Sequence, residues 1–140
     1  MPILWREAMS VDGGLIDRDH QALIAIINEF ADIAPSRATK DQLLSVLLKL
    51  ENYTKRHFRR EEEVQRFINF SACEAHRQEH VGLMTKLAQV RSELAATEEN
   101  QLNVVHQHIT EFLRHWLIDH VIKSDLSMKP FLSSSKQGPR

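Results

Sequence analysis

The feature of this 140-residue sequence that most constrains its fold is the scarcity of turn-forming residues in its long central part. From position 36 to position 129 the chain contains one glycine, Gly82, and no proline. Strands must be joined by turns, and turns draw on glycine, proline, asparagine and aspartate. A stretch this long with so few of them predicts long helices joined by short links, and so an all-α fold.

Apolar residues recur at steps of three and four along four segments, which is the spacing of one helix face. The first helix is expected over about residues 17–33, ending before Pro35. The second and third are expected to open at Thr39 and Ser71, each followed three residues later by Gln or Glu in a capping-box pattern. The fourth is expected to start near Thr97. Four such helices predict an up-down-up-down four-helix bundle, preceded by an N-terminal arm.

Length, charge and cysteine content exclude several classes of protein. We expect one domain over residues 1–132, followed by a disordered polar tail over 133–140. The 18 basic and 19 acidic residues give a net charge of −1, which argues against nucleic acid or a membrane as a partner. A single cysteine excludes an internal disulfide, and no segment resembles a membrane span or a signal peptide. These features predict a cytoplasmic protein that is a monomer or a weak homo-oligomer.

Histidine and acidic side chains interrupt the apolar stripes of the predicted helices. Burying such groups without partners costs several kcal/mol, so something must compensate them. In an antiparallel bundle, the starts of the first and third helices lie at the same end as the finishes of the second and fourth. Seven of these side chains fall in those parts of the chain and are predicted to converge in one layer: His20, His57, Glu61, His76, His80, His120 and Asp125.

Imidazoles and carboxylates that meet in an apolar interior are typical of a metal site. This set is too large for one zinc ion, which takes four ligands. Two octahedral ions offer about twelve positions, and the imidazoles, two bridging carboxylates and one bridging oxygen fill all but one of them. The remaining position suits a small exogenous ligand. A histidine-rich set favours iron over magnesium or calcium, which prefer oxygen ligands.

Asp125 is the least regular member of this set. Its spacing of five from His120 puts the two side chains about 140° apart on a regular helix, so we expect the helix to end or distort there. By itself Asp125 is typical of a solvated last turn, but the other convergent residues favour a ligand.

Other polar residues are expected outside the layer. His106, His108 and His115 fall off the inward stripe and are expected on the surface. The charged run at 59–63 is expected to be a solvated face, with one glutamate pointing inward. Cys73, in the first turn of the third helix, is interpreted as a plain buried cysteine rather than a redox group.

At these residues the sequence resembles the hemerythrin family, in particular the stand-alone bacterial hemerythrins. The resemblance covers roughly residues 5–132. It rests on four motifs: Ile16-Asp17-x-Asp19-His20-Gln21, Tyr53-Thr54-x-x-His57-Phe58-x-x-Glu61-Glu62, His76-x-x-x-His80, and Trp116-Leu117-x-x-His120-Val121-x-x-x-Asp125.

The resemblance implies a four-helix bundle that binds dioxygen reversibly at a non-haem di-iron centre with an oxo or hydroxo bridge. It assigns one iron to His76, His80 and His120, and the other, five-coordinate iron to His20 and His57. Glu61 and Asp125 would bridge the two irons. Four core residues would also wall the dioxygen pocket: Leu117, Trp116, Phe58 and Ile24.

We therefore expect an oxygen carrier, store or supplier rather than an enzyme. A first alternative is a sensor of oxygen, nitric oxide or redox state; with no output domain expected after Leu132, it would act through a separate partner chain. A second is a di-iron oxidase or peroxide scavenger. The oxidising di-iron bundles carry Glu-x-x-His repeats and more carboxylate, and no glutamate here has a histidine three residues later. Fewer anionic ligands favour the ferrous state and reversible binding.

Overall fold

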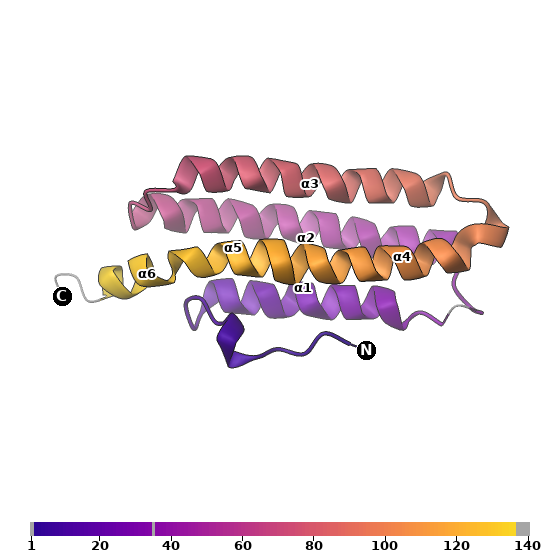
Figure 1. The fold of residues 1–140 in the computed structure, drawn as a ribbon, viewed down its shortest axis with the longest axis horizontal. Helices are drawn as coiled ribbons and strands as arrows, with labels where there is room; N and C mark the ends of the chain where they lie inside the picture. The colour runs from indigo at the N-terminus through magenta and orange to yellow at the C-terminus, as the bar shows by residue number, and fades with distance from the viewer. Residues whose placement is uncertain (1, 35, 137–140) are drawn as a thin grey trace.

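Four long helices run side by side in alternating directions and form the body of the molecule (Figure 1). The computed structural model describes residues 2–34 and 36–136. The helices are α1 (Leu15–Asp32), α2 (Lys40–Phe67), α3 (Cys73–Ala95) and α4 (Leu102–His115). Helix α2 packs between α1 and α3, and α4 packs against both α1 and α3. The predicted all-α four-helix bundle is confirmed.

The fourth rod of the bundle is longer than α4 alone. It continues through a π-helical segment (Trp116–Ile122), α5 (Lys123–Asp125), a 3-10 turn (Leu126–Met128) and α6 (Lys129–Lys136). In a π-helix each N–H bonds to the carbonyl five residues earlier, so each turn takes more residues than in an α-helix. The helix distortion expected on this stretch is therefore present.

Two of the predicted helix starts differ from the structure. The Thr39 capping box is present, with the Thr39 hydroxyl accepting from the Gln42 N–H at 3.1 Å. The Ser71 box is wrong: the Cys73 N–H bonds to the Phe70 carbonyl at 3.1 Å, and Ala72 takes the N-cap position without a side-chain bond. The start near Thr97 is also too early for α4, since the Thr97 hydroxyl bonds to the Glu93 carbonyl and so belongs to the end of α3.

The last helix extends into the stretch that the sequence predicted to be a polar tail. Helix α6 continues to Lys136, so residues 133–136 are helical, whereas residues 137–140 lie outside the described part of the chain. Contacts just before residue 133 explain the difference. Leu132 is buried, and the Phe131 ring meets Phe70 edge-on, 4.9 Å between centroids. Pro130 stands in the first turn of α6, where its missing N–H removes no helical hydrogen bond.

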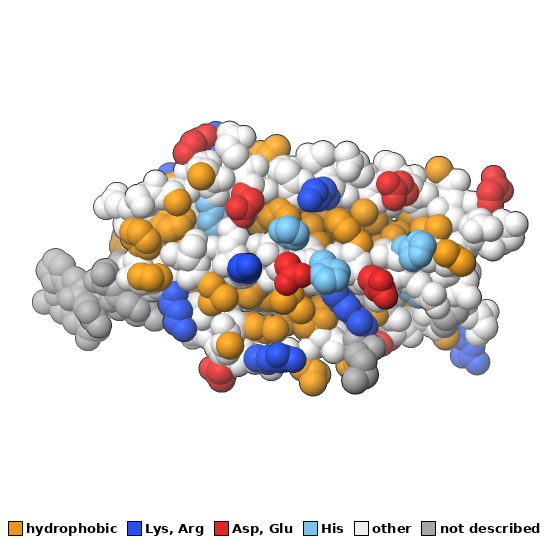
Figure 2. Space-filling model, viewed as in Figure 1, with side chains coloured by type: hydrophobic (Ala, Val, Ile, Leu, Met, Phe, Trp, Pro, Cys, Tyr) orange, Lys and Arg blue, Asp and Glu red, His pale blue; other side chains and the backbone are white. Residues whose placement is uncertain are grey.

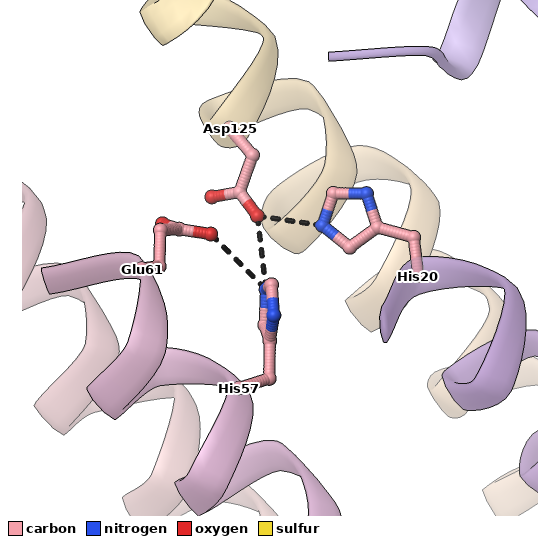
Figure 3. Close-up of side chains that lie close together, drawn as sticks. All are labelled: His20, His57, Glu61 and Asp125. Atoms are coloured by element: carbon pink, nitrogen blue, oxygen red, sulfur yellow. Dashed lines mark hydrogen bonds and ion pairs between the residues drawn. The ribbon is translucent and has the colours of Figure 1, made fainter. Parts of the chain in front are cut away.

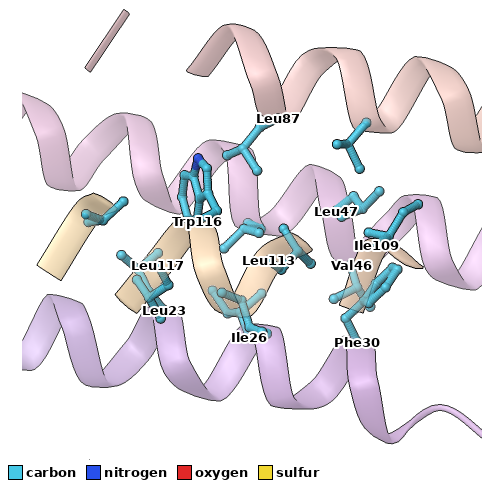
Figure 4. Close-up of a cluster of buried hydrophobic side chains, with 14 of the residues drawn as sticks. Leu23, Ile26, Phe30, Val46, Leu47, Leu87, Ile109, Leu113, Trp116 and Leu117 are labelled. Carbon is cyan, nitrogen blue, oxygen red and sulfur yellow. The ribbon is translucent and has the colours of Figure 1, made fainter. Parts of the chain in front are cut away.

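Two apolar clusters fill the bundle, and a polar layer lies between them. The larger cluster occupies the middle of the bundle and the end that lies away from the polar layer. Figure 4 shows side chains from all four helices meeting in this cluster. The smaller, which we call the end cap, consists of Val11, Ile16, Phe70, Met128 and Leu132. The polar side chains predicted to bind metal come from the stretches between these two clusters. Any site they form is therefore shielded from solvent along the bundle axis.

The N-terminal arm, residues 2–14, runs beside α1 (Figure 1). It closes the end of the bundle at which α1 begins, which we call the metal end because the predicted ligands lie there. The Asn28 side chain bonds both the N–H and the carbonyl of Ile3, at 2.8 and 2.9 Å. Where the arm turns into α1, the Asp17 carboxylate accepts from the Val11 and Gly13 N–H groups at 2.7 and 3.0 Å. Gly13 adopts a φ of 65°, which glycine tolerates without strain.

One histidine expected on the surface is instead buried. His106 is 3% exposed, and its Nε2 lies 2.8 Å from the carbonyl oxygen of Phe30. That carbonyl belongs to the last turn of α1, where carbonyls have no partner within the helix. The expectation for His106 was wrong because its hydrogen-bond partner is a carbonyl on another helix, which the spacing along α4 does not reveal. His108 and His115 are exposed, as expected.

The surface carries no field of one sign on the face shown in Figure 2, where basic and acidic side chains are intermixed. Among the described residues, every helix is too short or too polar to cross a membrane.

Candidate metal centre

Six of the seven predicted ligands meet in two overlapping groups of buried side chains. One group contains His20, His57, Glu61 and Asp125; the other contains Glu61, His76, His80 and Asp125. Within each group, one nitrogen or oxygen atom from every residue lies within 4.8 Å of the others. Figure 3 shows the first group, with side chains from α1, α2 and α5 pointing toward one another. The two carboxylates belong to both groups.

Each shared carboxylate turns one oxygen toward each group. For Asp125, Oδ2 lies 2.6 Å from His20 Nε2 and Oδ1 lies 2.9 Å from His76 Nε2. For Glu61, Oε2 lies 3.0 Å from His57 Nε2 and Oε1 lies 2.7 Å from His76 Nε2. A carboxylate oriented in this way can bridge two cations, one in each group.

The donor set fits two metal ions. Metal–nitrogen and metal–oxygen bonds of ~2.1 Å place two donors on one ion at most ~4 Å apart, close to the spacing within each group. Imidazole with carboxylate suits first-row transition metals. All six side chains are nearly inaccessible to solvent, so the carboxylates need the positive charge that a cation brings.

In the protein alone, protons on the histidines supply that charge. Burial lowers the pKa of His76, but hydrogen bonds to Asp125 and Glu61 outweigh burial and raise it to about 10. Burial also opposes protonation of His57, yet its bonds to Asp125, Asp19 and Glu61 raise its pKa well above the ordinary value. Burial raises the pKa of Asp125, whereas Glu61 and the surrounding histidines together hold it well below its usual range. A metal ion must displace such protons to bind.

Two of the histidines are also held from behind by carboxylates. His57 Nδ1 lies 2.9 Å from Asp19 Oδ2, and His80 Nδ1 lies 2.9 Å from Glu62 Oε2. Histidines that bind metal usually donate their other N–H in this way, which fixes the tautomer and aims the free nitrogen at the ion. Both Nε2 atoms accordingly face the centre, at 3.0 and 3.2 Å from Glu61 oxygens.

Asp19 is itself fixed by a network that reaches the surface. Arg60 donates two hydrogen bonds to its carboxylate, at 2.6 and 3.0 Å, and the Tyr53 hydroxyl donates a third at 3.0 Å. Burial raises the pKa of Asp19, but the bonds from His57 and Arg60 outweigh it and lower it to about 2. Asp19 therefore stays ionised while it orients the His57 ring.

Sequence reasoning missed the roles of Asp19, Arg60 and Glu62. The run at 59–63 was expected to be solvated apart from one glutamate, which is wrong for two further members. These residues flank the inward stripe, so helical spacing gave no sign of their partners on other helices. The available signal was that Asp19 directly precedes His20, a predicted ligand.

His120 is the predicted ligand that the structure does not bring into either group. Its side chain is exposed, whereas Trp116 and Val121 are buried at 1% exposure. The prediction assumed α-helical spacing, which returns residue 120 to the face of Trp116. The stretch from Trp116 to Ile122 is π-helical, so α-helical spacing does not hold there, and Val121 rather than His120 is buried.

The residues expected to wall a ligand pocket are all buried, and one of them contacts a predicted ligand. Ile24, Phe58, Trp116 and Leu117 are all buried within the larger apolar cluster. The Phe58 ring stacks on the His80 ring with 3.8 Å between centroids and 6° between planes. The centre therefore has an apolar wall on its side toward the middle of the bundle.

The fold and the centre together define a class: all-α bundle proteins with a buried candidate metal site of histidines and shared carboxylates. The comparisons with known proteins agree. The family model described as the hemerythrin HHE cation binding domain matches residues 14–132, and the chain belongs to this family.

Several relatives carry related names. A protein named bacteriohemerythrin from Methylococcus capsulatus is 28% identical over 121 residues, covering 86% of this chain and 88% of the relative. Another of that name, from Ralstonia nicotianae, is 26% identical over 140 residues, covering 99% and 94%. A hemerythrin-like protein from Naegleria gruberi is 26% identical over 131 residues, covering 94% of both chains.

The pKa of His76 predicts that the stability of the metal-free protein falls as pH rises. Its folded pKa, about 10, lies above its ordinary 6.5, so its stabilising contribution is complete below 6.5 and is lost as pH rises toward 10. In the metal-loaded protein the ion has replaced this proton, so the decline should be smaller. Urea midpoints of both forms at pH 6, 8 and 10 measure the effect. A metal-free midpoint that stays constant or rises over this range would contradict it.

Replacing Asp19 with asparagine is expected to weaken metal binding by 10- to 100-fold while the bundle remains folded. The substitution removes the charge that orients His57 and pairs with Arg60. Competition with a chelator measures the affinity, and circular dichroism checks the fold. Asp32→Asn, at the exposed end of α1, is the matched control and should bind metal like the parent. Equal affinities for the two variants would leave Asp19 without a positioning role.

Proposed function

We propose that the protein binds dioxygen reversibly at two iron ions, as an oxygen carrier, store or supplier. The observation that carries this proposal is the pair of carboxylates, Glu61 and Asp125, each with one oxygen toward each histidine group. Membership of the hemerythrin family and relatives named bacteriohemerythrin support iron and dioxygen as the metal and ligand. The proposed ligands are the six convergent residues together with His120.

Two iron ions held by these residues would supply the electrons for reversible binding of dioxygen. The chain's own residues would decide whether that binding stays reversible. Leu117 is 0% exposed, and with Ile24 and Trp116 it excludes water from the inner side of the centre. Dry apolar surroundings withhold the protons that would release a reduced product and leave the metal oxidised. This arrangement favours binding over oxygen activation.

The experiment that tests the function is a metal count joined to an absorption spectrum. Purified protein loaded with ferrous iron is expected to hold two irons per chain. On exposure to air it should develop a visible ligand-to-metal charge-transfer band, which should fade when oxygen is removed. One zinc per chain, or iron-loaded protein that stays colourless in air, would sink the proposal. A band that forms but never reverses would favour an oxidase or peroxide scavenger instead.

His120 is proposed as a ligand on the strength of the family motif, with its exposed position as the observation to be tested. His120 would bind the same iron as His76 and His80. Replacing it with alanine should therefore weaken retention of one of the two irons. His115→Ala, an exposed histidine on the same rod, is the matched control and should keep both. Iron counts after dialysis compare them. Two irons in both variants would restrict the ligand set to the six buried residues.

A further inference from the structure

Thr54 differs from the chain's other threonines in the use of its hydroxyl group. The hydroxyls of Thr85, Thr97 and Thr110 each bond to the carbonyl four residues earlier, at 2.9, 2.7 and 2.9 Å. Thr39 accepts the capping bond that starts α2. Thr54 is 0% exposed, and its Oγ1 has no hydrogen-bond partner among the described residues.

The position of Thr54 places this hydroxyl beside the metal centre. Thr54 precedes His57 by three residues on α2, so the two side chains share a helix face. Because α2 runs toward the metal end, Thr54 lies one turn nearer the middle of the bundle. Ile24 lies equally one turn inward of His20, on the antiparallel α1. Thr54 thus belongs to the wall that separates the centre from the larger apolar cluster.

Thr54 is the free donor of that wall. Ile24, Phe58 and Leu117 have apolar side chains, and the Trp116 indole N–H is already bonded to the Leu83 carbonyl at 3.2 Å. A buried hydroxyl without a partner costs about 1–3 kcal/mol, which a valine of the same shape would avoid. The wall therefore contains an uncompensated donor that a ligand at the centre can satisfy.

Gln65, on the opposite side of the layer, has a different role. It follows Glu61 by four residues, and its amide N–H donates to Glu61 Oε1 at 3.3 Å. Its Oε1 is also without a partner among the described residues, but this atom only accepts hydrogen bonds. A negatively charged ligand has no proton to donate to the Gln65 Oε1. The unpartnered atom of Gln65 therefore cannot take the donor role of the Thr54 hydroxyl.

We propose that the Thr54 hydroxyl donates a hydrogen bond to the small ligand bound at the centre, whether dioxygen or an anion such as azide. This inference rests on the proposed function. A ligand that is anionic, or that takes up electrons from the metal, accepts such a bond. A threonine hydroxyl can donate without giving up its proton, so it holds the ligand without protonating it. Thr54 is then a specificity-determining residue that favours charged ligands.

The test uses azide, titrated into the oxidised, iron-loaded protein and followed by absorption. Thr54→Val should bind azide at least ~10-fold more weakly than the parent, because a hydrogen bond to a charged group is lost. Thr54→Ser keeps the hydroxyl and should stay within ~3-fold of the parent. Thr110→Val, whose hydroxyl bonds to the His106 carbonyl on α4, is the matched control and should bind azide like the parent.

A second measurement separates this role from packing or metal binding. Thr54→Val should keep two irons, and without metal it should unfold at the same temperature as the parent or higher, because a buried hydroxyl without a partner has been removed. Unchanged azide affinity in Thr54→Val, or loss of an iron, overturns the inference. If the parent binds azide but not dioxygen reversibly, the proposed function fails while the azide comparison still decides the role of Thr54. If the loaded parent binds neither, both fail.

Discussion

The structure depends on two buried carboxylates that must share positive charge with the histidines around them. Glu61 and Asp125 lie on different rods of the bundle, and each contacts histidines from both groups. Burying charged groups in a low-dielectric interior is costly unless charges of opposite sign lie beside them. Protons on His57 and His76 supply that positive charge in the protein alone, and metal ions can supply it in their place. The need for positive charge beside Glu61 and Asp125 therefore holds α1, α2, α3 and the fourth rod together at the metal end of the bundle.

Sequence reasoning could recover the bundle and most of the layer because both follow from regular helical spacing. His57 and Glu61, or His76 and His80, stand four residues apart on straight α-helices, so their shared face was predictable. His120 was not, because its direction depends on a π-helical segment that the spacing alone does not reveal. His106, Arg60 and Glu62 were misjudged for another reason: their partners lie on other helices.

The supports behind the histidines are unequal, so individual rings differ in how firmly they are oriented. His57 is held by Asp19, which Arg60 and Tyr53 hold in turn, and His80 is held by Glu62. His20 is fully buried, yet its Nδ1 has no hydrogen-bond partner among the described residues. The ring of His20 is thus oriented by packing and by Asp125 alone. The group containing His20 also contains His57, which shares its helix face with Thr54.

The end cap joins three segments that are far apart in the sequence: the arm at Val11, the α2–α3 turn at Phe70 and the terminal helix at Leu132. It covers the metal layer on the side away from the main core. Such a cap can open locally while the rest of the bundle stays folded, since its contacts are few and peripheral. Ions would then enter and leave through fluctuations of the cap, far more often than through global unfolding. The ligands would set how tightly metal is held, and the cap would set how quickly it exchanges.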